Sequence, residues 1–256
     1  MSEPTPHQQV TQAIKDYEAR TLQLIEEVRQ RLLVQLGSAS AFGAERLADL
    51  LRTIDEAVIR FKDQFNQLLL QGTTELAALG STIVASTLQQ AEIVAVIPTV
   101  TVELLSTLGT TTLDLVTKIG DNLRRDLSVE VQLGVLGVKA PSDVINAIDQ
   151  LLDAEGVNGY AARAETITRT EVGRAQSEAS QASMETAVRQ GARIQKQWLH
   201  SSVRNPRSAH VAASGQTRDV NESFIVNGVA LRYPRDPQGP AAETINCRCV
   251  AVPIIR

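Results

Sequence analysis

Apolar residues in the first half of the chain recur three, four or seven positions apart, the spacing that places them on one face of a helix. The first series comprises Ile14, Tyr17, Leu24, Ile25, Val28, Leu32 and Leu36. Further series cover residues 47–68, 76–97 and 100–123. We expect the first three helices to end at Gly37, Gly72 and Pro98, because glycine and proline are common helix terminators. Four helices of this length predict a bundle or an extended helical stalk.

Two shorter segments follow these helices. Residues 131–138 contain two glycines, which a helix interior disfavours, so we interpret this run as an apolar connector or as a contact that becomes ordered only on assembly. A short helix is expected to begin at Pro141 and to end near Gly156. Ser142 has the side chain of a helix cap, and the next residue is an aspartate that suits the positive end of the helix dipole.

The pattern changes after residue 159. A long polar helix rich in alanine and serine is predicted over residues 160–190, and its small residues allow close packing against a neighbour. Residues 194–198 alternate between apolar and polar side chains, as in a strand. Asn227-Gly228 lies between two apolar arms, which is typical of a tight β-hairpin.

The run Gly-Val-Asn-Gly at residues 156–159 is typical of a domain boundary. We therefore predict an α+β protein with two domains. Residues 1–156 would form a mostly helical domain, and residues 157–256 a small α+β domain with one long helix and three to four antiparallel strands.

Charge is distributed unevenly between these two parts. Residues 1–159 carry 12 basic and 21 acidic side chains, net −9, whereas residues 160–256 carry 13 basic and 8 acidic side chains, net +5. This pattern fits a set of surface salt bridges or contact with DNA or an acidic partner. The arginines that could make such contacts are Arg204, Arg207, Arg218, Arg232, Arg235 and Arg248.

The sequence offers little sign of export or of a simple membrane span. The apolar run at residues 93–97 is far too short to cross a bilayer, and the first six residues lack the basic and then apolar pattern of a signal peptide. We expect a cytoplasmic protein whose two cysteines stay reduced or bind a metal. A membrane-active ejection protein is an alternative, based on the apolar and threonine-rich residues 83–138.

Both cysteines lie near the end of the sequence, at Cys247 and Cys249. The apolar run that follows favours a strand, in which thiols at i and i+2 share one face. With His210 they could form a zinc site of the Cys₂His type. The fourth ligand would come from His200, Asp219 or Asp236. Buried apolar thiols, or a disulfide, are the alternatives.

A second interpretation concerns His200 and His210. Together with Arg204, Arg207 and Glu171 they could supply the acid, the base and the phosphate clamp of a nuclease. A small basic domain on a helical carrier also has the layout of a toxin. Histidines in polar loops are more often hydrogen-bonded structural groups, and we favour that interpretation.

Several residues of the C-terminal region occur in an order and spacing that resemble one family. They are Arg169-Thr170-Glu171, Trp198, His210 after an arginine-rich turn, Gly215, Phe224, Tyr233-Pro234, Asp236-Pro237 and Asn246-Cys247-Arg248-Cys249. Over residues 160–252 the chain resembles the phage Mu F-like head morphogenesis proteins, which are minor capsid components of tailed bacteriophages. The turn at residues 201–209 departs from the family pattern, because it lacks the acidic residue that relatives tend to carry there.

The resemblance implies a non-enzymatic protein of the virion, present in few copies at the portal vertex or in the capsid interior. It implies the portal protein, the major capsid protein or packaged double-stranded DNA as partners, and a role in head assembly and in DNA packaging or ejection. We expect the acidic helices to self-associate or to bind the portal or capsid, and the arginine-rich domain to face a partner or DNA.

The signature residues also suggest structural roles. Glu171 and Arg174 are three positions apart on a helix and can form an ion pair. Arg169 should point to a different face from Glu171. Trp198 is expected in the core of the small domain, and Asn246 is expected to bond the backbone of the preceding proline-rich loop.

Overall fold

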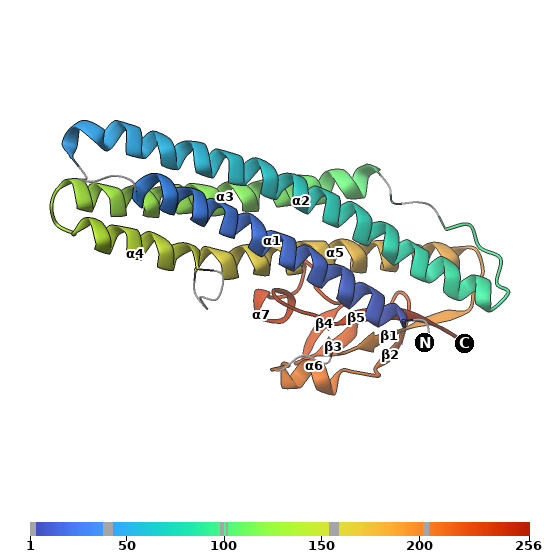
Figure 1. The fold of residues 1–256 in the computed structure, drawn as a ribbon. Coiled ribbons are helices and arrows are strands. Elements are labelled where there is room, and N and C mark those ends of the chain that lie inside the picture. The colour runs from blue at the N-terminus through green and yellow to red at the C-terminus, as the bar shows by residue number, and fades with distance from the viewer. Residues whose placement is uncertain (1–3, 38–42, 98–99, 101, 154–158, 202–204) are drawn as a thin grey trace. The chain divides into compact units, whose positions relative to one another are not determined.

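The computed structural model describes residues 4–37, 43–97, 100, 102–153, 159–201 and 205–256. These residues form two compact units. Figure 1 shows their helices and strands as a ribbon. Unit 1 comprises Met1–Tyr17, Leu69–Gly109 and Thr168–Arg256, and unit 2 comprises Glu18–Leu68 and Thr110–Ile167. The predicted boundary at residue 156 falls within residues 154–158, outside the described residues, and stays a prediction.

The helices of the first 190 residues carry most of the apolar core. They are α1 (Pro6–Gly37), the 3₁₀ turn η1 (Ala44–Arg46), α2 (Leu47–Gln90), α3 (Val102–Val135), α4 (Pro141–Leu152) and α5 (Tyr160–Arg189). The predicted end of the first helix at Gly37 and the long helix after residue 159 are confirmed.

The predicted break at Gly72 is wrong, because α2 continues through this residue to Gln90. A Cβ atom at Gly72 would lie 2.9 Å from side-chain atoms of both Tyr17 and Val172. The glycine therefore allows close packing inside a helix instead of ending one. The helix also stops before Pro98: Glu92 has a φ of 56°, and residues 93–97 are not helical.

Two further local predictions are corrected. The interpretation of residues 131–138 as a connector is wrong for its first five residues, because α3 runs to Val135 with Val131 fully buried. Burial of one apolar face outweighs the helix-breaking tendency of the glycine. Ser142 does not cap α4: the capping position is Ala140, without a side-chain hydrogen bond, and Pro141 takes the first helical position.

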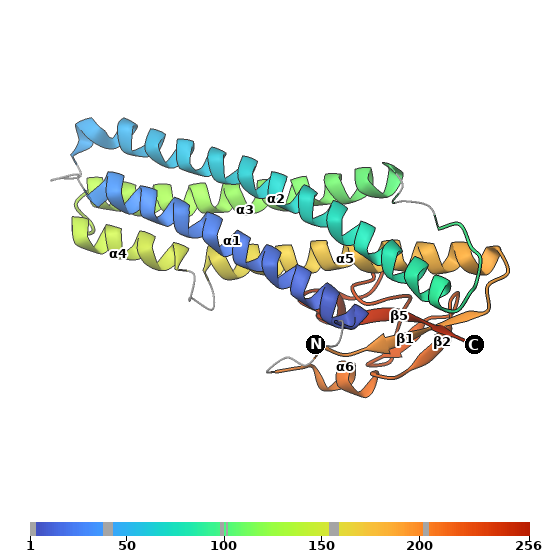
Figure 2. The same cartoon turned by 45° about the vertical axis from the view of Figure 1, so that its right-hand side comes forward.

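Unit 2 is built from helical segments that lie side by side in both Figures 1 and 2. Its interior is apolar and includes Ile25, Leu32, Ile54, Phe61, Phe65, Leu123, Leu127, Ile148 and Leu152. Ion pairs join its helices at the periphery. Arg124 Nε lies 2.5 Å from Asp55 Oδ1, and Lys62 Nζ lies 2.9 Å from Asp121 Oδ1.

Unit 1 places the second half of α2 against α5 at very short range. A Cβ atom at Gly80 would lie 2.5 Å from the Gln176 carbonyl oxygen. Ser183 Oγ donates to Ser81 Oγ at 3.0 Å across the same contact. The small residues of α5 therefore do allow close packing, as predicted.

The strands of unit 1 form a three-stranded antiparallel sheet and a separate hairpin. The elements after α5 are β1 (Ile194–Leu199), α6 (Ser208–Ala212), β2 (Thr217–Asp219), β3 (Phe224–Val226), β4 (Val229–Leu231), α7 (Ala241–Thr244) and β5 (Val250–Ile255). The sheet order is β2-β1-β5, and β3 pairs with β4. Figure 2 shows this sheet beside the C-terminal half of α5. The predicted α+β fold is confirmed.

The hairpin between β3 and β4 turns at Asn227-Gly228, as the sequence predicted. These residues have φ values of 53° and 75°, the positive angles that such a turn requires. The prediction that the cysteines lie in a strand is wrong. Cys247 and Cys249 are in the irregular segment that leads into β5.

One described helix, spanning residues 44–90, is long and apolar enough to cross a membrane. Within its most apolar window, 56% is buried inside the protein. Core helices pass the same test of length and composition, so this is weak evidence for a membrane span. The prediction that residues 93–97 are too short to span a bilayer concerns a different segment, so it does not conflict with this finding.

Candidate functional site

The core of the small C-terminal region surrounds Trp198, which is fully buried as predicted. Its ring makes edge-on contacts with Phe224 at 5.3 Å and with His210 at 5.8 Å between ring centroids. Cys247 and Cys249 pack in the same buried cluster. An apolar interior therefore lies directly against two thiols and an imidazole.

The three predicted metal ligands come together. His210 lies on α6, and its Nδ1 atom is 3.6 Å from Cys247 Sγ and 3.4 Å from Cys249 Sγ. The possible ligand atoms of all three residues lie within 4.8 Å of one another, and all three residues are buried. Although the cysteines precede β5, their thiols still converge on one side of the segment.

The other ring nitrogen of His210 is held by a carboxylate. His210 Nε2 lies 2.9 Å from Glu243 Oε2, and both side chains are less than 10% exposed. Asn227 Nδ2 donates to the second carboxylate oxygen, Oε1, at 2.8 Å. Glu243 therefore favours the tautomer in which Nε2 carries the proton and Nδ1 faces the thiols with its lone pair.

The electrostatic surroundings favour one thiolate in this cluster. A hydrogen bond from the Cys249 thiol lowers the pKa of Cys247 well below its usual range, and His210 and Arg235 add to the effect. The pKa of Cys249 is raised, because it donates to Cys247 and is buried. Burial opposes protonation of His210, but hydrogen bonds with Cys247 and Glu243 outweigh it and raise the pKa of the imidazole.

Arg235 binds the backbone of the cysteine segment. It is completely buried, and its Nε donates to the Cys247 carbonyl at 2.8 Å. Its Nη1 donates to the Gly173 carbonyl at 3.0 Å and to Ser177 Oγ at 3.2 Å. Burial lowers the pKa of this guanidinium. The prediction that Arg235 contacts DNA or a partner is therefore wrong, since it has no exposed surface.

A cavity of about 210 Å³ opens beside the thiols. Its walls include Arg169, His200, Arg207, His210, Asn246, Cys247, Arg248 and Cys249. The two histidines and several arginines thus share one cavity, as a nuclease would require. Glu171 is not among the lining residues: its pKa is raised by burial, and it pairs with Arg174 at 2.6 Å, as predicted.

Two of the proposed fourth ligands are engaged elsewhere. Asp236 is buried and binds Arg232, with Oδ1 2.8 Å from Arg232 Nη2. Asp219 Oδ1 accepts a hydrogen bond from Gln195 at 2.7 Å on the exposed edge of the sheet. His200 lines the cavity, but among the described residues the close group contains His210, Cys247 and Cys249 without it.

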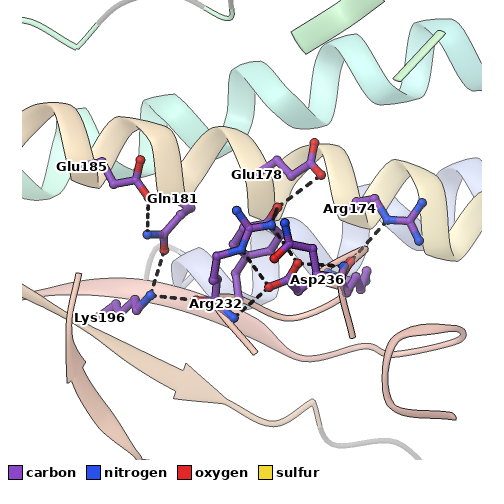
Figure 3. A network of polar contacts seen from close by, with 10 residues as sticks. Arg174, Glu178, Gln181, Glu185, Lys196, Arg232 and Asp236 are labelled. Atoms are coloured by element: carbon purple, nitrogen blue, oxygen red, sulfur yellow. Dashed lines mark hydrogen bonds and ion pairs between the residues drawn. The ribbon is translucent and has the colours of Figure 1, made fainter. Parts of the chain in front are cut away.

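A chain of polar contacts, here called the α5 bridge, joins α5 to the loop after β4. Figure 3 shows that it runs from Glu185 through Gln181 to Lys196 and, separately, from Glu178 and Arg174 to the loop. Lys196 is fully buried, and its Nζ donates to Gln181 Oε1 at 3.1 Å and to the Arg232 carbonyl at 2.7 Å. Burial lowers the pKa of Lys196 to about 8.

Arg169 and Thr170, the first residues of the family signature, both contact Asn246. Arg169 Nη1 donates to Asn246 Oδ1, and the Asn246 backbone N–H donates to Thr170 Oγ1 at 3.0 Å. The expected bond from Asn246 to the proline-rich loop is not among these contacts, so that prediction is corrected. Asn246 has a φ of 61°, and it places Cys247 directly after a tight turn.

The remaining predicted residues are scattered around this region. Gly215 has a φ of 84°, and its backbone N–H donates to the Trp198 carbonyl at 2.8 Å. Arg207 donates to the carbonyls of Glu243 and Ile245. Arg218, Arg232 and Arg248 are partly or largely exposed, whereas Arg204 lies outside the described residues.

Sequence reasoning missed Glu243, Asn227 and Lys196 as members of these networks. The sequence indicates only a turn at Asn227 and only a strand position for Lys196. Glu243 follows a proline-rich loop and carries no local signal of its role, because its partner His210 is 33 residues away. Such pairings depend on tertiary structure.

The described residues thus combine long helices with a small antiparallel sheet and a hairpin, and one buried histidine meets two buried cysteines in unit 1. Residues 136–252 match the family model described as Phage Mu protein F like protein. This match covers a little under half of the chain, and it confirms the resemblance predicted for residues 160–252. The family indicates a phage head morphogenesis protein.

Two curated relatives are similar to parts of the chain. One is the NAD(+)--arginine ADP-ribosyltransferase EFV of Enterococcus faecalis, 30% identical over 138 residues, which are 54% of this chain and 27% of the relative. The other is the protein YqbB of Bacillus subtilis, 35% identical over 97 residues, or 36% of this chain and 31% of the relative. The matches thus span less than a third of either relative. No solved structure matches.

Proposed function

We propose that this protein is a non-enzymatic minor component of a bacteriophage head, located at the portal vertex or in the capsid interior. It would aid head assembly and DNA packaging or ejection. One observation carries this proposal beyond the family match: most residues of the family signature are buried and bind one another. Arg169, Thr170, Glu171, Trp198, Phe224 and Asp236 are each at most 5% exposed.

Buried signature residues favour a docking scaffold over a catalytic surface. The Asn246 contacts fasten the end of the chain to α5, and the α5 bridge fastens the loop after β4 to the same helix. A reacting group must reach its substrate, whereas these side chains are buried, and the polar ones Arg169, Thr170, Glu171 and Asp236 take part in internal hydrogen bonds. The module can therefore keep its shape while its outer surface binds a partner.

The charge distribution suggests how the partners are divided. The net charge of +5 over residues 160–256 suits packaged DNA or an acidic protein surface, and the net charge of −9 over residues 1–159 disfavours DNA. We infer that the helical part binds the portal, the capsid or a second copy of the chain, and that the C-terminal part faces the DNA or a partner.

A phage lysate tests the location. Capsids containing a tagged chain would be separated by sedimentation and cross-linked, and the products would be identified by mass spectrometry. We expect the chain to sediment with capsids, in far fewer copies than the major capsid protein, and to cross-link to the portal or the inner capsid surface. A chain that remains entirely outside the capsid fraction would contradict the proposal.

A binding assay with duplex DNA tests the proposal that the C-terminal part faces packaged DNA. The full chain should bind duplex DNA with an affinity that falls as salt increases, because arginines displace counterions from phosphates. The double variant Arg218→Gln/Arg248→Gln should bind more weakly and with a smaller salt slope. The matched control Arg52→Gln/Arg60→Gln, which removes the same charge from α2, should bind like the wild type. An equal loss of DNA affinity in both double variants would contradict a DNA-binding surface on the C-terminal part.

An enzyme is the second candidate, because His200, His210 and Arg207 share a cavity and one relative is named an ADP-ribosyltransferase. Against it, both ring nitrogens of His210 already have partners, and the cavity of about 210 Å³ is smaller than typical ligand pockets. We expect no nuclease activity with magnesium, manganese or zinc, and no transfer from labelled NAD to an arginine acceptor. Turnover that is lost in His200→Gln would overturn the non-enzymatic proposal.

A further inference from the structure

The strongest unexplained feature of unit 1 is the buried group formed by His210, Cys247 and Cys249. A lone buried thiol is common and behaves as a small apolar side chain. Two buried thiols that both approach the same imidazole nitrogen, at 3.4 and 3.6 Å, are a different arrangement. Nitrogen and sulfur ligands at such positions are the donor set that zinc prefers in proteins.

The surroundings of the histidine support a metal site independently of the thiols. Histidines that bind metals nearly always donate their other ring N–H to a carboxylate, carbonyl or water, which fixes the ring. His210 has this partner in Glu243, and Asn227 in turn holds Glu243 through the carboxylate oxygen that faces away from the imidazole. The lone pair of Nδ1 is thereby aimed at the two sulfur atoms.

The cysteine segment also has the backbone that a thiolate ligand needs. The Cys249 backbone N–H lies 3.4 Å from Cys247 Sγ and can donate to the sulfur. The positive φ of Asn246 turns the chain just before Cys247. Arg235 donates a hydrogen bond to the Cys247 carbonyl and so fixes the position of this peptide group. These contacts position the sulfur atoms without any contribution from a metal.

We propose that His210 Nδ1, Cys247 Sγ and Cys249 Sγ bind one zinc ion. Both sulfur atoms bind as thiolates, so the proton that Cys249 donates to Cys247 is released to solvent, while the imidazole keeps its Nε2 proton in the hydrogen bond to Glu243. The same three residues line the cavity, so a water molecule can occupy the fourth position of a tetrahedral site. The ion would fasten α6 to the segment before β5.

Metal binding by the full-length protein is the first test. The chain would be purified without chelator under reducing conditions and analysed for metal, then stripped and titrated with Co²⁺ and Zn²⁺. We expect one equivalent of zinc and, with Co²⁺, the charge-transfer absorption of thiolate ligands. Emission from Trp198 should also fall with Co²⁺, because its ring lies 5.8 Å from that of His210. Less than half an equivalent of metal would overturn the proposal.

Thiol protection tests the ligands in the unmodified chain, so it does not depend on a variant that folds. Saturating Zn²⁺ should protect both Cys247 and Cys249 from alkylation, and a chelator should restore their reactivity. Alkylation of either thiol at an unchanged rate under saturating Zn²⁺ would contradict the proposal. A disulfide between the two in protein isolated from reducing cytoplasm would do so as well.

Single substitutions then distinguish the residues that bind the metal from residues that only lie near it. Cys247→Ser and Cys249→Ser should abolish the thiolate absorption stepwise, and Glu243→Gln should keep one equivalent but weaken affinity by roughly 10- to 100-fold. The control is His200→Gln, which removes the other histidine of the same cavity and should leave binding unchanged. Equal affinity in the wild type and Cys247→Ser would reject the site. None of these results depends on whether the protein is found in a phage head.

Discussion

The two units of this protein use polar residues in opposite ways. Unit 2 has a mainly apolar interior, and its ion pair between Arg124 and Asp55 lies at the surface. Unit 1 buries Arg235, Lys196 and Asp236 completely or nearly so. Each of the three has hydrogen-bond partners, although Nη2 of Arg235 has none. Surface ion pairs contribute little to stability, whereas a buried charge that loses its partners is costly. Unit 1 should therefore be the more sensitive of the two to single polar substitutions.

Arg235→Met should have the largest effect. It removes three hydrogen bonds and leaves the buried Cys247 carbonyl without the donor that Arg235 supplies, so we expect a loss of about 4 kcal/mol in the free energy of unfolding. Urea unfolding followed by the emission of Trp198 measures it, because this residue reports on unit 1 alone. A loss below about 1 kcal/mol would show that the buried arginine is dispensable.

Stability should also depend on the ionisation of Lys196. The pKa of this lysine is lowered to about 8 in the folded protein, so above pH 8 the unfolded chain binds more protons than the folded chain. The free energy of unfolding should then rise with pH between about 8 and 10.5, by up to about 3 kcal/mol from this group.

The variant Lys196→Met isolates the contribution of this lysine, since the cysteines and tyrosines that titrate nearby are present in both proteins. The stability of the variant relative to the wild type should be greatest below pH 8 and should decline as the pH rises. Parallel pH profiles for the two proteins would mean that Lys196 keeps an ordinary pKa.

Gly80→Ala tests the close approach of α2 and α5 in unit 1. The new methyl group would lie 2.5 Å from the Gln176 carbonyl oxygen, which belongs to helix backbone and cannot move freely. We expect a loss of about 2 kcal/mol in the unfolding of unit 1. Gly37→Ala is the matched control: nothing lies within 4 Å of its Cβ position, so stability should be unchanged or slightly higher.

Arg124→Gln should have the smallest effect and completes the comparison with Arg235. Its side chain is 59% exposed, and its pairing with Asp55 competes with water and salt. We expect no measurable change in helix unfolding followed by circular dichroism. A marked loss would show that surface ion pairs stabilise unit 2 more than its apolar core suggests.

The candidate site was only partly predictable from the sequence. The chemistry of His210, Cys247 and Cys249 predicts a metal site, and the structure brings the three residues together. Asp236 and Asp219 have the right chemistry for a fourth ligand, but they lie with Arg232 and Gln195 instead. The role of Glu243 has no local signal, because the distance between a carboxylate and an imidazole is set by how α7 and α6 pack.

The sequence by itself determined the helices, the hairpin at Asn227-Gly228 and the order of the family signature, because periodicity and turn chemistry act over a few residues. Only the tertiary structure decided that Gly72 lies inside a helix, that Arg235 is buried, and which carboxylate holds His210. These outcomes depend on contacts between residues far apart in the chain, where burial and close packing outweigh local preference.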